Sequence, residues 1–511
     1  MIKATAALLE RYADKIKGVL SCYDRIVGIG TLPEICHPRA MAAYLTQRGI
    51  RLFDYTQWAE PLREELRGNA ERLAAEAGLK IEFIRRNNFR KEERVHQILA
   101  ERGNQPGLVH IFSAMEPCAS FKPWHDKVTH QTFFKPDTAK CLHYYFYFID
   151  EQLGLCYLRV PTWAPFRLQF YFNGHNALAR QLDRKGIAYT MVDNAFVDIE
   201  DFESAQGLAD GLQVSAIHRR LDHWMRQCCP IVRHFQAGYH WSLMQTEYAT
   251  DIVFKRREDL KPLYDALVRT AVHTVQAEQV ATFLGRKLHP NFLGELGNDF
   301  HTRIEGTRLR HQMGPAAIKI YDKHGLVLRI ETTTNDVSFF KHHREVEQRD
   351  GSRTMKLAPV KKTIYSLSIL RELLGASNRR YLEFLSTLDV PTDGAKNLEK
   401  ISRPVRQGDR TFRGFNLFTG DDLEVFVALL RGEFNVTGLT CRRLRRVLEH
   451  KTGPQISRLL RRLRLHSLIR KIGRTYKYYL TPLGRTVVLA ALHLRQLLLP
   501  TLTSPLRVAE S

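Results

Sequence analysis

The densest run of residues with chemical potential in this chain is cationic and lies between Thr440 and Leu480. This segment holds thirteen Lys or Arg side chains and a single acidic residue, Glu449. Guanidinium and ammonium groups bind phosphate oxygens, and a polyanionic partner is the commonest reason for a protein to concentrate so much like charge. We therefore predict that this segment forms a nucleic-acid-binding face.

The elements that must position these cations follow from the apolar spacing. In PQISRLLRRLRLHSLI the leucines and Ile456 recur along one face of a helix, which leaves the polar side chains on the other face. A short hairpin around Gly473 comes next and carries further cations. The predicted contacts with nucleic acid are Gln455, Ser457, Arg458, Arg461 and Arg462 on the helix and Lys471, Arg474 and Lys477 on the hairpin.

The order of elements in this last part of the chain is three helices, a hairpin and a further helix. With the run SRLLRRLRLHSLIRKIGRTYKYYLTPLG, it resembles the winged-helix transcription regulators of the MarR and ArsR type. The resemblance implies that the third helix enters the major groove of DNA and that the hairpin lies along the backbone. The alternative is that the winged helix serves as a protein-interaction module.

The middle of the chain is rich in strand-like runs. Between residues 141 and 254 come three strand candidates, a helix, a fourth strand candidate and then helices. This order resembles the RNase H-like fold of DDE transposases and related nucleases. The resemblance implies acidic residues at the end of the first strand, after the fourth strand and on a later helix. Such residues hold Mg²⁺ or Mn²⁺ ions that activate a water or a 3′-hydroxyl.

Four acidic residues occupy these places. Asp150 and Asp193 stand at the first two, and either Glu247 or Asp251, expected as an i,i+4 pair on one helix face, supplies the third. The resemblance thus implies Asp150, Asp193, Glu247 and Asp251 as catalytic residues, with Asp150, Asp193 and Glu247 as metal ligands. The alternative is that Asp150 and Asp193 begin turns at strand ends, where aspartate is common.

A second stretch, RIEGTRLRHQMGPAAIKIYDKHGLVLRIE, is similar to the strand-YxK-strand-RxE rhythm of rolling-circle replication initiators. The resemblance implies Tyr321 as a nucleophile on a DNA phosphate, Lys323 as a phosphate contact, and Glu331 or Glu305 as a metal ligand. The alternative is a cross-strand polar face, because Tyr321 alternates with isoleucines and Arg329 stands beside Glu331 on the neighbouring strand.

The whole pattern predicts an α/β multidomain protein. We expect an N-terminal α/β domain at residues 1–118, an RNase H-like α/β domain with a mixed sheet at 119–290, and a β cluster with helices at 291–387. A polar linker at 388–417 then leads to the winged helix at 418–511. Several stretches, among them HIFSAMEPC, also resemble a widespread group of uncharacterised bacterial proteins, whose abundance suggests a mobile element.

Composition narrows the class of protein further. The 511 residues are 44% hydrophobic and carry a formal net charge of +23, which excludes a wholly disordered chain and favours a polyanionic partner. The eight cysteines form no CxxC pair, and neither a signal peptide nor an apolar run long enough to span a membrane is evident. We expect a cytoplasmic protein with reduced thiols and no membrane partner.

The leading interpretation is a metal-dependent nuclease or transposase-like strand-transfer enzyme of a mobile element, using Mg²⁺ or Mn²⁺. DNA is the first partner expected, and a structured or guide RNA is the alternative. The competing class is a non-enzymatic winged-helix regulator or an RNA-binding component of a ribonucleoprotein. The sequence leaves the oligomeric state open.

Overall fold

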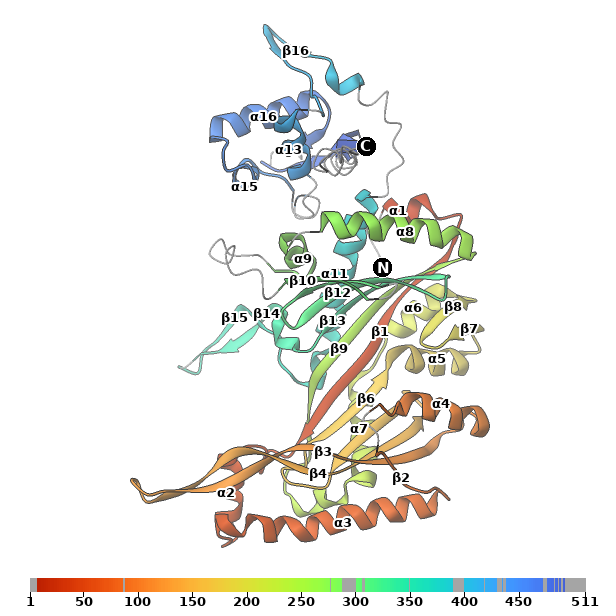
Figure 1. Ribbon diagram of the computed structural model, residues 1–511, viewed down its shortest axis with the longest axis vertical. Coiled ribbons are helices and arrows are strands. Elements are labelled where there is room, and N and C mark those ends of the chain that lie inside the picture. The colour runs from red at the N-terminus through yellow and green to blue at the C-terminus, as the bar shows by residue number, and fades with distance from the viewer. Residues whose placement is uncertain are drawn as a thin grey trace, which may run out of the picture.

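One large β-sheet runs through the protein and organises the rest of the chain around it (Figure 1). The computed structural model describes residues 7–85, 88–275, 277–286, 300–305, 308–348, 350–388, 399–417, 419–429, 434, 438–471, 476–481, 483–485, 487–488 and 490–491. Within them the sheet consists of β1 (Ile16–Thr31), β2 (Glu82–Phe83), β3 (Gly107–Asp126), β4 (Gln131–Asp150), β5 (Gly154–Pro161), β6 (Leu168–Asn173), β9 (His240–Phe254), β10 (Phe300–Glu305), β11 (Arg308–Met313), β12 (Ala316–Lys323) and β13 (Val327–Thr334).

The strand order is β10-β11-β12-β13-β9-β1-β6-β5-β4-β3-β2, and only the β2–β3 pair is parallel within the described part of this sheet. Further strands pair outside the large sheet as short hairpins. These are β7 (Tyr189–Val192) with β8 (Ala195–Ile199), β14 (Lys341–Glu347) with β15 (Arg353–Pro359), β16 (Val405–Gln407) with β17 (Arg410–Phe412), and β18 (Ile469–Lys471) with β19 (Tyr478–Leu480).

Most helices lie between the strands of the large sheet in sequence, and the C-terminal helices follow its last strand. They are α1 (Ala7–Arg11), α2 (Pro38–Gln47), α3 (Tyr55–Glu76), α4 (Lys91–Arg102), α5 (Gly174–Lys185), α6 (Phe202–Asp210), α7 (Val214–Cys228), α8 (Arg257–Thr274), α9 (Ala277–Phe283), α11 (Leu367–Leu388), α13 (Gly420–Leu429), α15 (Cys441–Val447) and α16 (Gly453–Leu465). None of these described helices combines the length and the hydropathy that crossing a membrane would require. The architecture is mixed α/β, as the sequence predicts.

The strands β9, β12 and β13 differ between their two faces. On one face Ile320 and Ile330 are fully buried in a cluster that includes leucines of α8 and α11. Asn378 of α11 fixes this packing, because its amide donates a 3.0 Å hydrogen bond to the Tyr248 carbonyl of β9. The opposite face is polar and lies under α5 and the β7–β8 hairpin (Figure 1).

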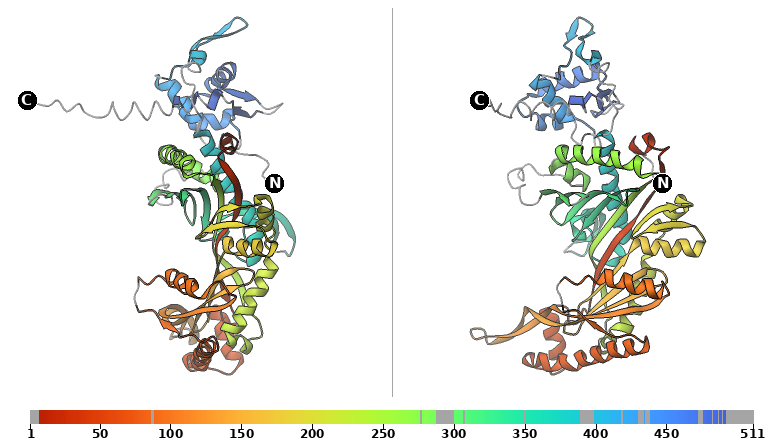
Figure 2. Two further views of the ribbon diagram at one scale, coloured as in Figure 1. Left: turned by 90° about the vertical axis from the view of Figure 1, so that its right-hand side faces the viewer. Right: turned by 45° about the vertical axis from the view of Figure 1, so that its right-hand side comes forward.

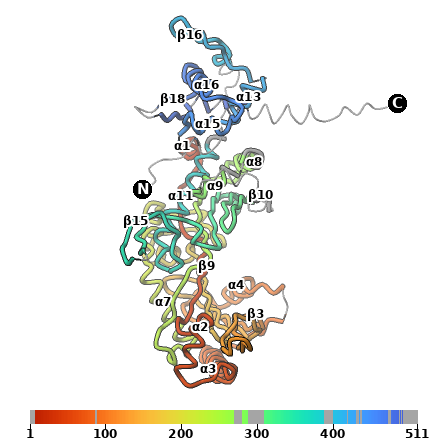
Figure 3. Tube along the Cα trace, turned by 90° about the vertical axis from the view of Figure 1, so that its left-hand side faces the viewer, coloured from red at the N-terminus to blue at the C-terminus, as the bar shows by residue number. Residues whose placement is uncertain are grey.

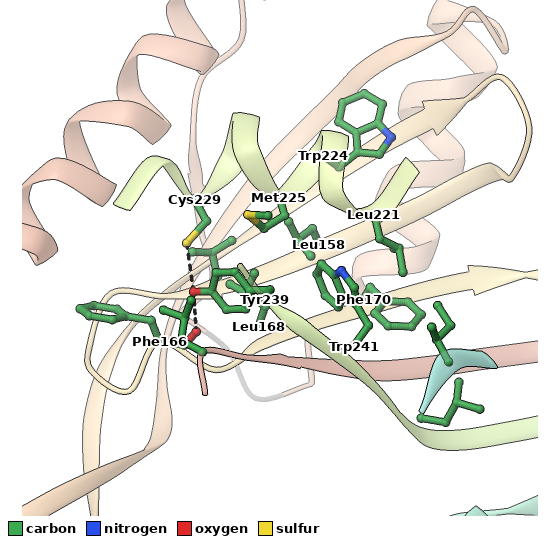
Figure 4. Packing of buried hydrophobic residues seen from close by; sticks show 14 of the residues in the cluster. Leu158, Phe166, Leu168, Phe170, Leu221, Trp224, Met225, Cys229, Tyr239 and Trp241 are labelled. Carbon is green, nitrogen blue, oxygen red and sulfur yellow. Dashed lines mark hydrogen bonds between the residues drawn. The ribbon is translucent and has the colours of Figure 1, made fainter. Parts of the chain in front are cut away.

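A second part of the core lies where α7 packs on β5 and β6 (Figure 4). The rings of Phe170 and Trp241 meet edge to face, with their centroids 5.4 Å apart. The hydroxyl of Tyr239 donates a 3.0 Å hydrogen bond to the carbonyl of Phe166, so this buried polar group is satisfied. Large aromatic side chains bury much apolar area each, and they anchor the sheet to α7 here.

The C-terminal unit, as we call α13, α15, α16 and the β18–β19 hairpin, lies at the opposite end of the molecule from α3 (Figures 2 and 3). Leu439 pairs with Tyr478 and so adds a third strand contact to the hairpin. A capping box between Thr452 and Gln455 begins α16, because the Gln455 side chain accepts a 2.7 Å hydrogen bond from the Thr452 amide. The helix buries Ile456 and three leucines on one face.

Two expectations about the middle of the chain are wrong. The segment around Glu247 and Asp251 is strand β9 and not a helix, because ladders with β1 and β13 on both sides override its local propensity. The expected fourth strand of the RNase H-like order is β7, which pairs with β8 and stands outside the large sheet. Strands on both sides of the boundary expected near residue 290 share one sheet, since β13 pairs with β9.

The expected linker at residues 388–417 is folded where the structure describes it. The β16–β17 hairpin lies within it, and residues 399–402 are helical. Ile401 and Phe415 are 1% and 2% exposed, and both pack in the cluster that contains the core of the C-terminal unit. Apolar residues scattered through a polar segment therefore tie this stretch to the unit that follows it.

Candidate functional site

Charged and hydrogen-bonding side chains line the polar face of three neighbouring strands. In a β-strand every second residue points to the same side, so alternate positions of β9, β12 and β13 share this face. The cross-strand register aligns Glu247 with Thr333, Asp251 with Arg329, and Lys319 with Glu331. The central face, as we call it, comprises Glu247 and Asp251 of β9, Lys319, Tyr321 and Lys323 of β12, and Arg329, Glu331 and Thr333 of β13.

Asp24 joins the central face from β1 through a break in the ladder. Tyr23 pairs with Tyr248 and Arg25 with Glu247, so Asp24 is an extra residue without a partner on β9. An extra residue of this kind is a β-bulge, which re-aims a side chain and is frequent beside active sites. Here the bulge brings the Asp24 carboxylate to the carboxylates of the next strands.

The acidic cluster consists of Asp24, Glu247 and Glu331. One carboxylate oxygen from each lies within 4.8 Å of the others, and this is the group of potential metal ligands that the described residues form. Three strands supply the three groups, namely β1, β9 and β13. Three carboxylates this close repel one another unless protons or cations compensate them.

Glu331 is the most enclosed member of the cluster, with 1% of its surface exposed. Its Oε1 accepts hydrogen bonds from Nζ of Lys319 at 2.5 Å and from Oγ1 of Thr333 at 3.2 Å. Its Oε2 accepts a 2.5 Å hydrogen bond from the hydroxyl of Tyr321. Burial, followed by the charge of Glu331, raises the pKa of Tyr321 well above its ordinary value, so this phenol holds its proton at neutral pH.

Glu247 stands at the more open side of the cluster. Its Oε1 lies 3.5 Å from Nζ of Lys319 and accepts a 3.2 Å hydrogen bond from the side-chain amide of Gln245. Burial raises the pKa of Glu247 to about 7, with a further rise from Glu331 that Lys319 opposes. The cluster therefore exchanges a proton near neutral pH, and a cation could take the place of that proton.

Asp24 has a different electrostatic environment from Glu247. Its Oδ1 accepts hydrogen bonds from the side-chain amides of Asn173 at 3.1 Å and Asn194 at 2.5 Å. The same oxygen lies 3.1 Å from Nδ1 of His175 and 3.5 Å from Nη1 of Arg329. Burial raises the pKa of Asp24, but Arg329 and His175 outweigh burial and hold this pKa well below its ordinary value.

Arg329 and Asp251 form a fully buried ion pair beneath the acidic cluster. Nε and Nη2 of Arg329 each donate a 2.6 Å hydrogen bond to an oxygen of Asp251. Nη2 also donates to the carbonyl of Asn194 at 2.7 Å and lies 2.9 Å from Nε2 of His175. The same ring nitrogen of His175 also lies 3.2 Å from Oδ2 of Asp251, so it contacts both members of the ion pair. The pair thus fixes α5 and the β7–β8 turn to the sheet.

The N-terminus of α5 packs closely against β1 and places His175 beside the central face. The side chain of Asn173 caps the helix by accepting from the amides of His175 at 2.8 Å and Asn176 at 3.2 Å. A Cβ atom on Gly174 would lie 2.1 Å from the carbonyl oxygen of Tyr23, so only glycine permits this approach. The run FNGH therefore encodes both the cap and the close packing.

Lys323 and Tyr321 lie at the rim of the site and are half-buried, in contrast to Arg329. Nζ of Lys323 donates a hydrogen bond to the side chain of Asn194. Burial and the neighbouring Arg329 lower the pKa of Lys323. The rim therefore offers an ammonium group and a phenol beside three carboxylates, an arrangement able to hold a cation together with an anionic ligand.

Of the acidic residues expected from the sequence, Asp150 lies apart from this cluster. It ends β4, and its Oδ1 accepts from the amides of Gln152 at 2.8 Å and Leu153 at 3.0 Å in the turn that follows. Its Oδ2 accepts from Nε of Arg220 at 2.7 Å and from the indole of Trp224 at 2.9 Å. These contacts match the turn alternative, and Asp150 belongs to no metal-ligand group among the described residues.

Asp193 also lies in a turn. Its backbone has a φ of +51°, its side chain is 66% exposed, and its carboxylate lies 3.3 Å from Nε2 of His324. Within the described residues it shares no ligand group with Glu247. The expected ligands Asp150 and Asp193 therefore do not join Glu247, whose neighbours among the described potential metal ligands are Asp24 and Glu331.

The residues expected from the second stretch do come together. Tyr321, Lys323 and Glu331 lie on the central face, and Tyr321 and Glu331 contact each other directly. The cross-strand polar face, given as the alternative for this stretch, is therefore present, and it is buried. The side chain of Glu305 lies outside the described part of the structure.

The expected nucleic-acid contacts divide into exposed and structural residues. Arg458 is exposed on α16, and Arg461 is exposed while its guanidinium donates to Oε1 of Gln407 at 3.0 Å. Arg462 is instead buried, because it donates at 2.8 and 2.9 Å to the two oxygens of Asp422. Assigning Arg462 as an exposed contact is therefore wrong.

The remaining expected contacts take different places. Gln455 is exposed but caps its own helix, and the Oγ of Ser457 lies 3.6 Å from Sγ of Cys441. Lys471 and Lys477 are exposed at the ends of the β18–β19 hairpin. Arg474 lies outside the described residues.

Asp24, Lys319 and His175 were not among the site residues expected from the sequence. Asp24 stands in the run YDRIVGIG and Lys319 in AAIKIY, so each is a charged residue inside an apolar strand. A charge in a strand that is buried on both faces needs a partner, and this was the available signal. His175 carried no comparable signal, because its role depends on where α5 begins.

Comparisons of this chain with protein-family models, curated proteins and solved structures give no match.

Proposed function

We propose that this protein is a metal-dependent enzyme that cleaves or transfers phosphodiester strands of nucleic acid at the acidic cluster. The observation that carries the proposal is the convergence of Asp24, Glu247 and Glu331, within 4.8 Å of one another, beside the cations Lys319 and Lys323. Carboxylates that gather around one point favour a hard divalent cation, and adjacent ammonium groups favour an anionic substrate such as phosphate.

The donor set fits Mg²⁺ or Mn²⁺. Carboxylate oxygens are the ligands that these ions prefer, and a Glu247 pKa of about 7 means that the cluster binds a proton where a cation would bind. Asp24, Glu247 and Glu331 would hold the ion. When bound, it would supply charge for the phosphoryl oxygens and a water or hydroxyl of lowered pKa.

The protein's own side chains would position the substrate. Lys323 supplies an ammonium group for a non-bridging oxygen of a phosphodiester. Lys319, which is buried and bound to Glu331 and near Glu247, holds these carboxylates in place. Asn194 holds Lys323 by a hydrogen bond, and the buried Arg329–Asp251 pair holds the turn that carries Asn194. Preorganised cations of this kind stabilise charge as it develops on a phosphoryl group, without reorganising during the reaction.

Tyr321 supports a second candidate reaction at the same site. Its hydroxyl donates a 2.5 Å hydrogen bond to Glu331, which is the arrangement of a nucleophile and its base. In that reaction the phenolic oxygen bonds to phosphorus, the bond from phosphorus to the leaving strand oxygen breaks, Glu331 takes the phenolic proton, and water protonates the leaving oxygen. A covalent protein–nucleic acid adduct distinguishes this course from direct hydrolysis.

We further propose that the C-terminal unit is a winged helix that directs this activity to its target. Arg458, Arg461 and Arg464 are exposed on α16, whose apolar face packs inward. The β16–β17 hairpin lies against this helix, because Arg461 contacts Gln407. Exposed arginines of α16 are placed to reach phosphates, which makes binding steeply salt-dependent.

The test is a cleavage assay with the full chain on single-stranded and duplex DNA and on RNA. We expect cleavage or strand transfer with Mg²⁺ or Mn²⁺ and none in EDTA, with Glu331→Gln reducing the rate by two orders of magnitude or more. Tyr321→Phe retains activity if water is the nucleophile and abolishes both activity and the covalent adduct if Tyr321 attacks.

Asp193→Asn is the matched control, because it removes an exposed carboxylate outside the cluster. It should leave the cleavage rate unchanged. Nucleic-acid binding without any cleavage under these conditions would contradict the enzyme and leave the non-enzymatic regulator. Activity unaffected by Glu331→Gln would show that the acidic cluster is structural.

A further inference from the structure

Strands β3 and β4 continue beyond the large sheet as a two-stranded arm, which we define as residues 120–140 (Figure 1). In this stretch β4 pairs with β3, and its pairing with β5 begins only at His143. The arm therefore projects from the sheet with a turn at its tip. An isolated two-stranded ribbon is only marginally stable, so a projecting arm needs anchoring at its base.

One face of the arm supplies that anchor. Phe121 and Phe134 are buried, and the ring of Tyr55 lies 6.2 and 5.3 Å from their rings, measured between centroids. Alternate residues of a strand point to opposite faces. The neighbouring positions 122, 124, 133 and 135 therefore share the other face, away from this anchor.

That outer face carries a pair of exposed aromatic residues. Trp124 and Phe133 are direct cross-strand partners, and 44% and 39% of their surfaces are exposed. Large aromatic side chains are rarely left this exposed in pairs without a partner to cover them, because each forfeits a large burial free energy. Their rings form a platform beside the tip of the arm.

Two lysines flank the platform. Lys122 and Lys135 stand directly opposite each other on the two strands, and both are exposed. Like charges in direct cross-strand register destabilise a hairpin, so an anionic ligand would remove a cost that the free arm bears. Nζ of Lys135 lies 3.7 Å from the centre of the Trp124 ring, which places the cation and the aromatic surface within reach of one nucleotide.

We propose that the arm binds single-stranded nucleic acid, with unpaired bases stacking on Trp124 and Phe133 and phosphates contacting Lys122 and Lys135. Aromatic platforms interleaved with cations are the general means of binding unpaired strands without regard to sequence. The arm as a whole carries four lysines and two aspartates, which favours an anionic partner over a neutral one. The inference rests on the proposed function in one respect, that the substrate is nucleic acid, and adds that part of it is single-stranded.

The test is a fluorescence titration of the full chain with oligo(dT) and with a matched duplex, in EDTA so that no cleavage occurs. Trp124 is the most exposed of the five tryptophans, so stacking on it should quench the emission. We expect quenching by oligo(dT), and a loss of affinity of about tenfold or more for Trp124→Ala and for Phe133→Ala. Trp124→Phe should keep the affinity and lose most of the quenching.

Met355→Ala is the matched control, since it removes an exposed apolar side chain from another hairpin, β14–β15. It should leave oligo(dT) binding unchanged. Equal affinity for oligo(dT) in the wild type and both alanine variants, or quenching by lipid vesicles in place of oligo(dT), would overturn the proposal. If the arm variants bind normally while Mg²⁺-dependent cleavage persists, only this inference fails. If no nucleic acid binds at all, the proposed function fails with it.

Discussion

The central face of the sheet and the C-terminal unit both gather cationic side chains, but they use them in opposite ways. On the central face Arg329 is fully buried and each of its polar contacts is a residue of the site. On α16 Arg458 is exposed and faces solvent. Buried charges require paired partners, whereas exposed charges remain available for a ligand, so the same residue type fixes a site in one region and presents a surface in the other.

Arg462 shows that this division does not follow the sequence. It lies in the same helix as Arg458, yet it is buried against Asp422 and donates to the carbonyls of Arg413 at 3.0 Å and Gly414 at 2.5 Å. Within the C-terminal unit it resembles Arg329 in environment. Arginines of this protein therefore fall into buried residues with fixed partners and exposed residues, and substitutions in the two groups should have different effects.

The largest effect is expected at Arg329. Arg329→Met should lower the free energy of unfolding by about 3–5 kcal/mol, because Asp251 would remain buried without its partner. Urea unfolding followed by far-UV circular dichroism measures this. Arg442→Met, on an exposed position of α15, is the control and should change stability by less than about 0.5 kcal/mol. Equal effects at the two sites would erase the contrast between the regions.

A smaller loss is expected at Arg462, where Arg413 stays 3.8 Å from Asp422 and partly compensates it. Arg462→Met should cost about 1.5–3 kcal/mol of stability through the lost charge-assisted hydrogen bonds. Arg458→Ala should leave stability unchanged and reduce the slope of log affinity against log salt by about 0.9, the value for one phosphate contact. Thermal unfolding and salt titration of DNA binding separate the two. If Arg462→Met changed the salt dependence and Arg458→Ala changed stability instead, α16 would contact DNA through another face.

The next effect depends on pH and belongs to Glu247. Its pKa in the folded protein is about 7, above its ordinary value near 4.5, so the folded state holds a proton that the unfolded state has lost. Stability from this group is complete below pH 4.5 and is lost as the pH rises through about 7. Urea unfolding at several pH values, compared with Glu247→Gln, measures the difference. An identical pH profile in the variant would place the titration elsewhere.

The smallest effect is expected at Asp193. Asp193→Asn should change stability by no more than about 0.5 kcal/mol, because the side chain is 66% exposed and asparagine also tolerates the backbone φ of +51°. It should also leave metal affinity unchanged, in contrast to any substitution in the acidic cluster. Calorimetric titration with Mn²⁺ checks this. Loss of Mn²⁺ binding in this variant would instead make Asp193 a metal ligand, as the sequence predicts.

How far the sequence could predict each region depends on the range of the contacts involved. The helix and hairpin of the C-terminal unit follow from apolar periodicity within about forty residues, and Ile456, Leu459 and Leu463 are buried there as the spacing predicts. The same periodicity could not show that Arg462 turns inward, because its partner Asp422 lies on a different helix, α13, and helical periodicity does not show which helices contact each other.

The acidic cluster was harder to predict because three separate strands build it. Asp24 reaches Glu247 and Glu331 only through the antiparallel register of β1, β9 and β13 and through a bulge, none of which is local in sequence. Glu247 was expected on a helix, whereas it lies on strand β9. Tyr321, Lys323 and Glu331 share one face because β12 and β13 are joined by a tight turn, which keeps their contacts local in sequence.

The most direct test of the account is a calorimetric titration of the purified full chain with Mn²⁺ at pH 8, where Glu247 is ionised. We predict saturable binding that is lost in the Glu247→Gln, Glu331→Gln double variant and retained in Asp193→Asn, both shown to be folded by circular dichroism. Affinity should fall as the pH drops through about 7, since Glu247 must release its proton. Metal binding that survives in the double variant, or no binding in the wild type, would contradict the assignment of Asp24, Glu247 and Glu331 as a metal centre.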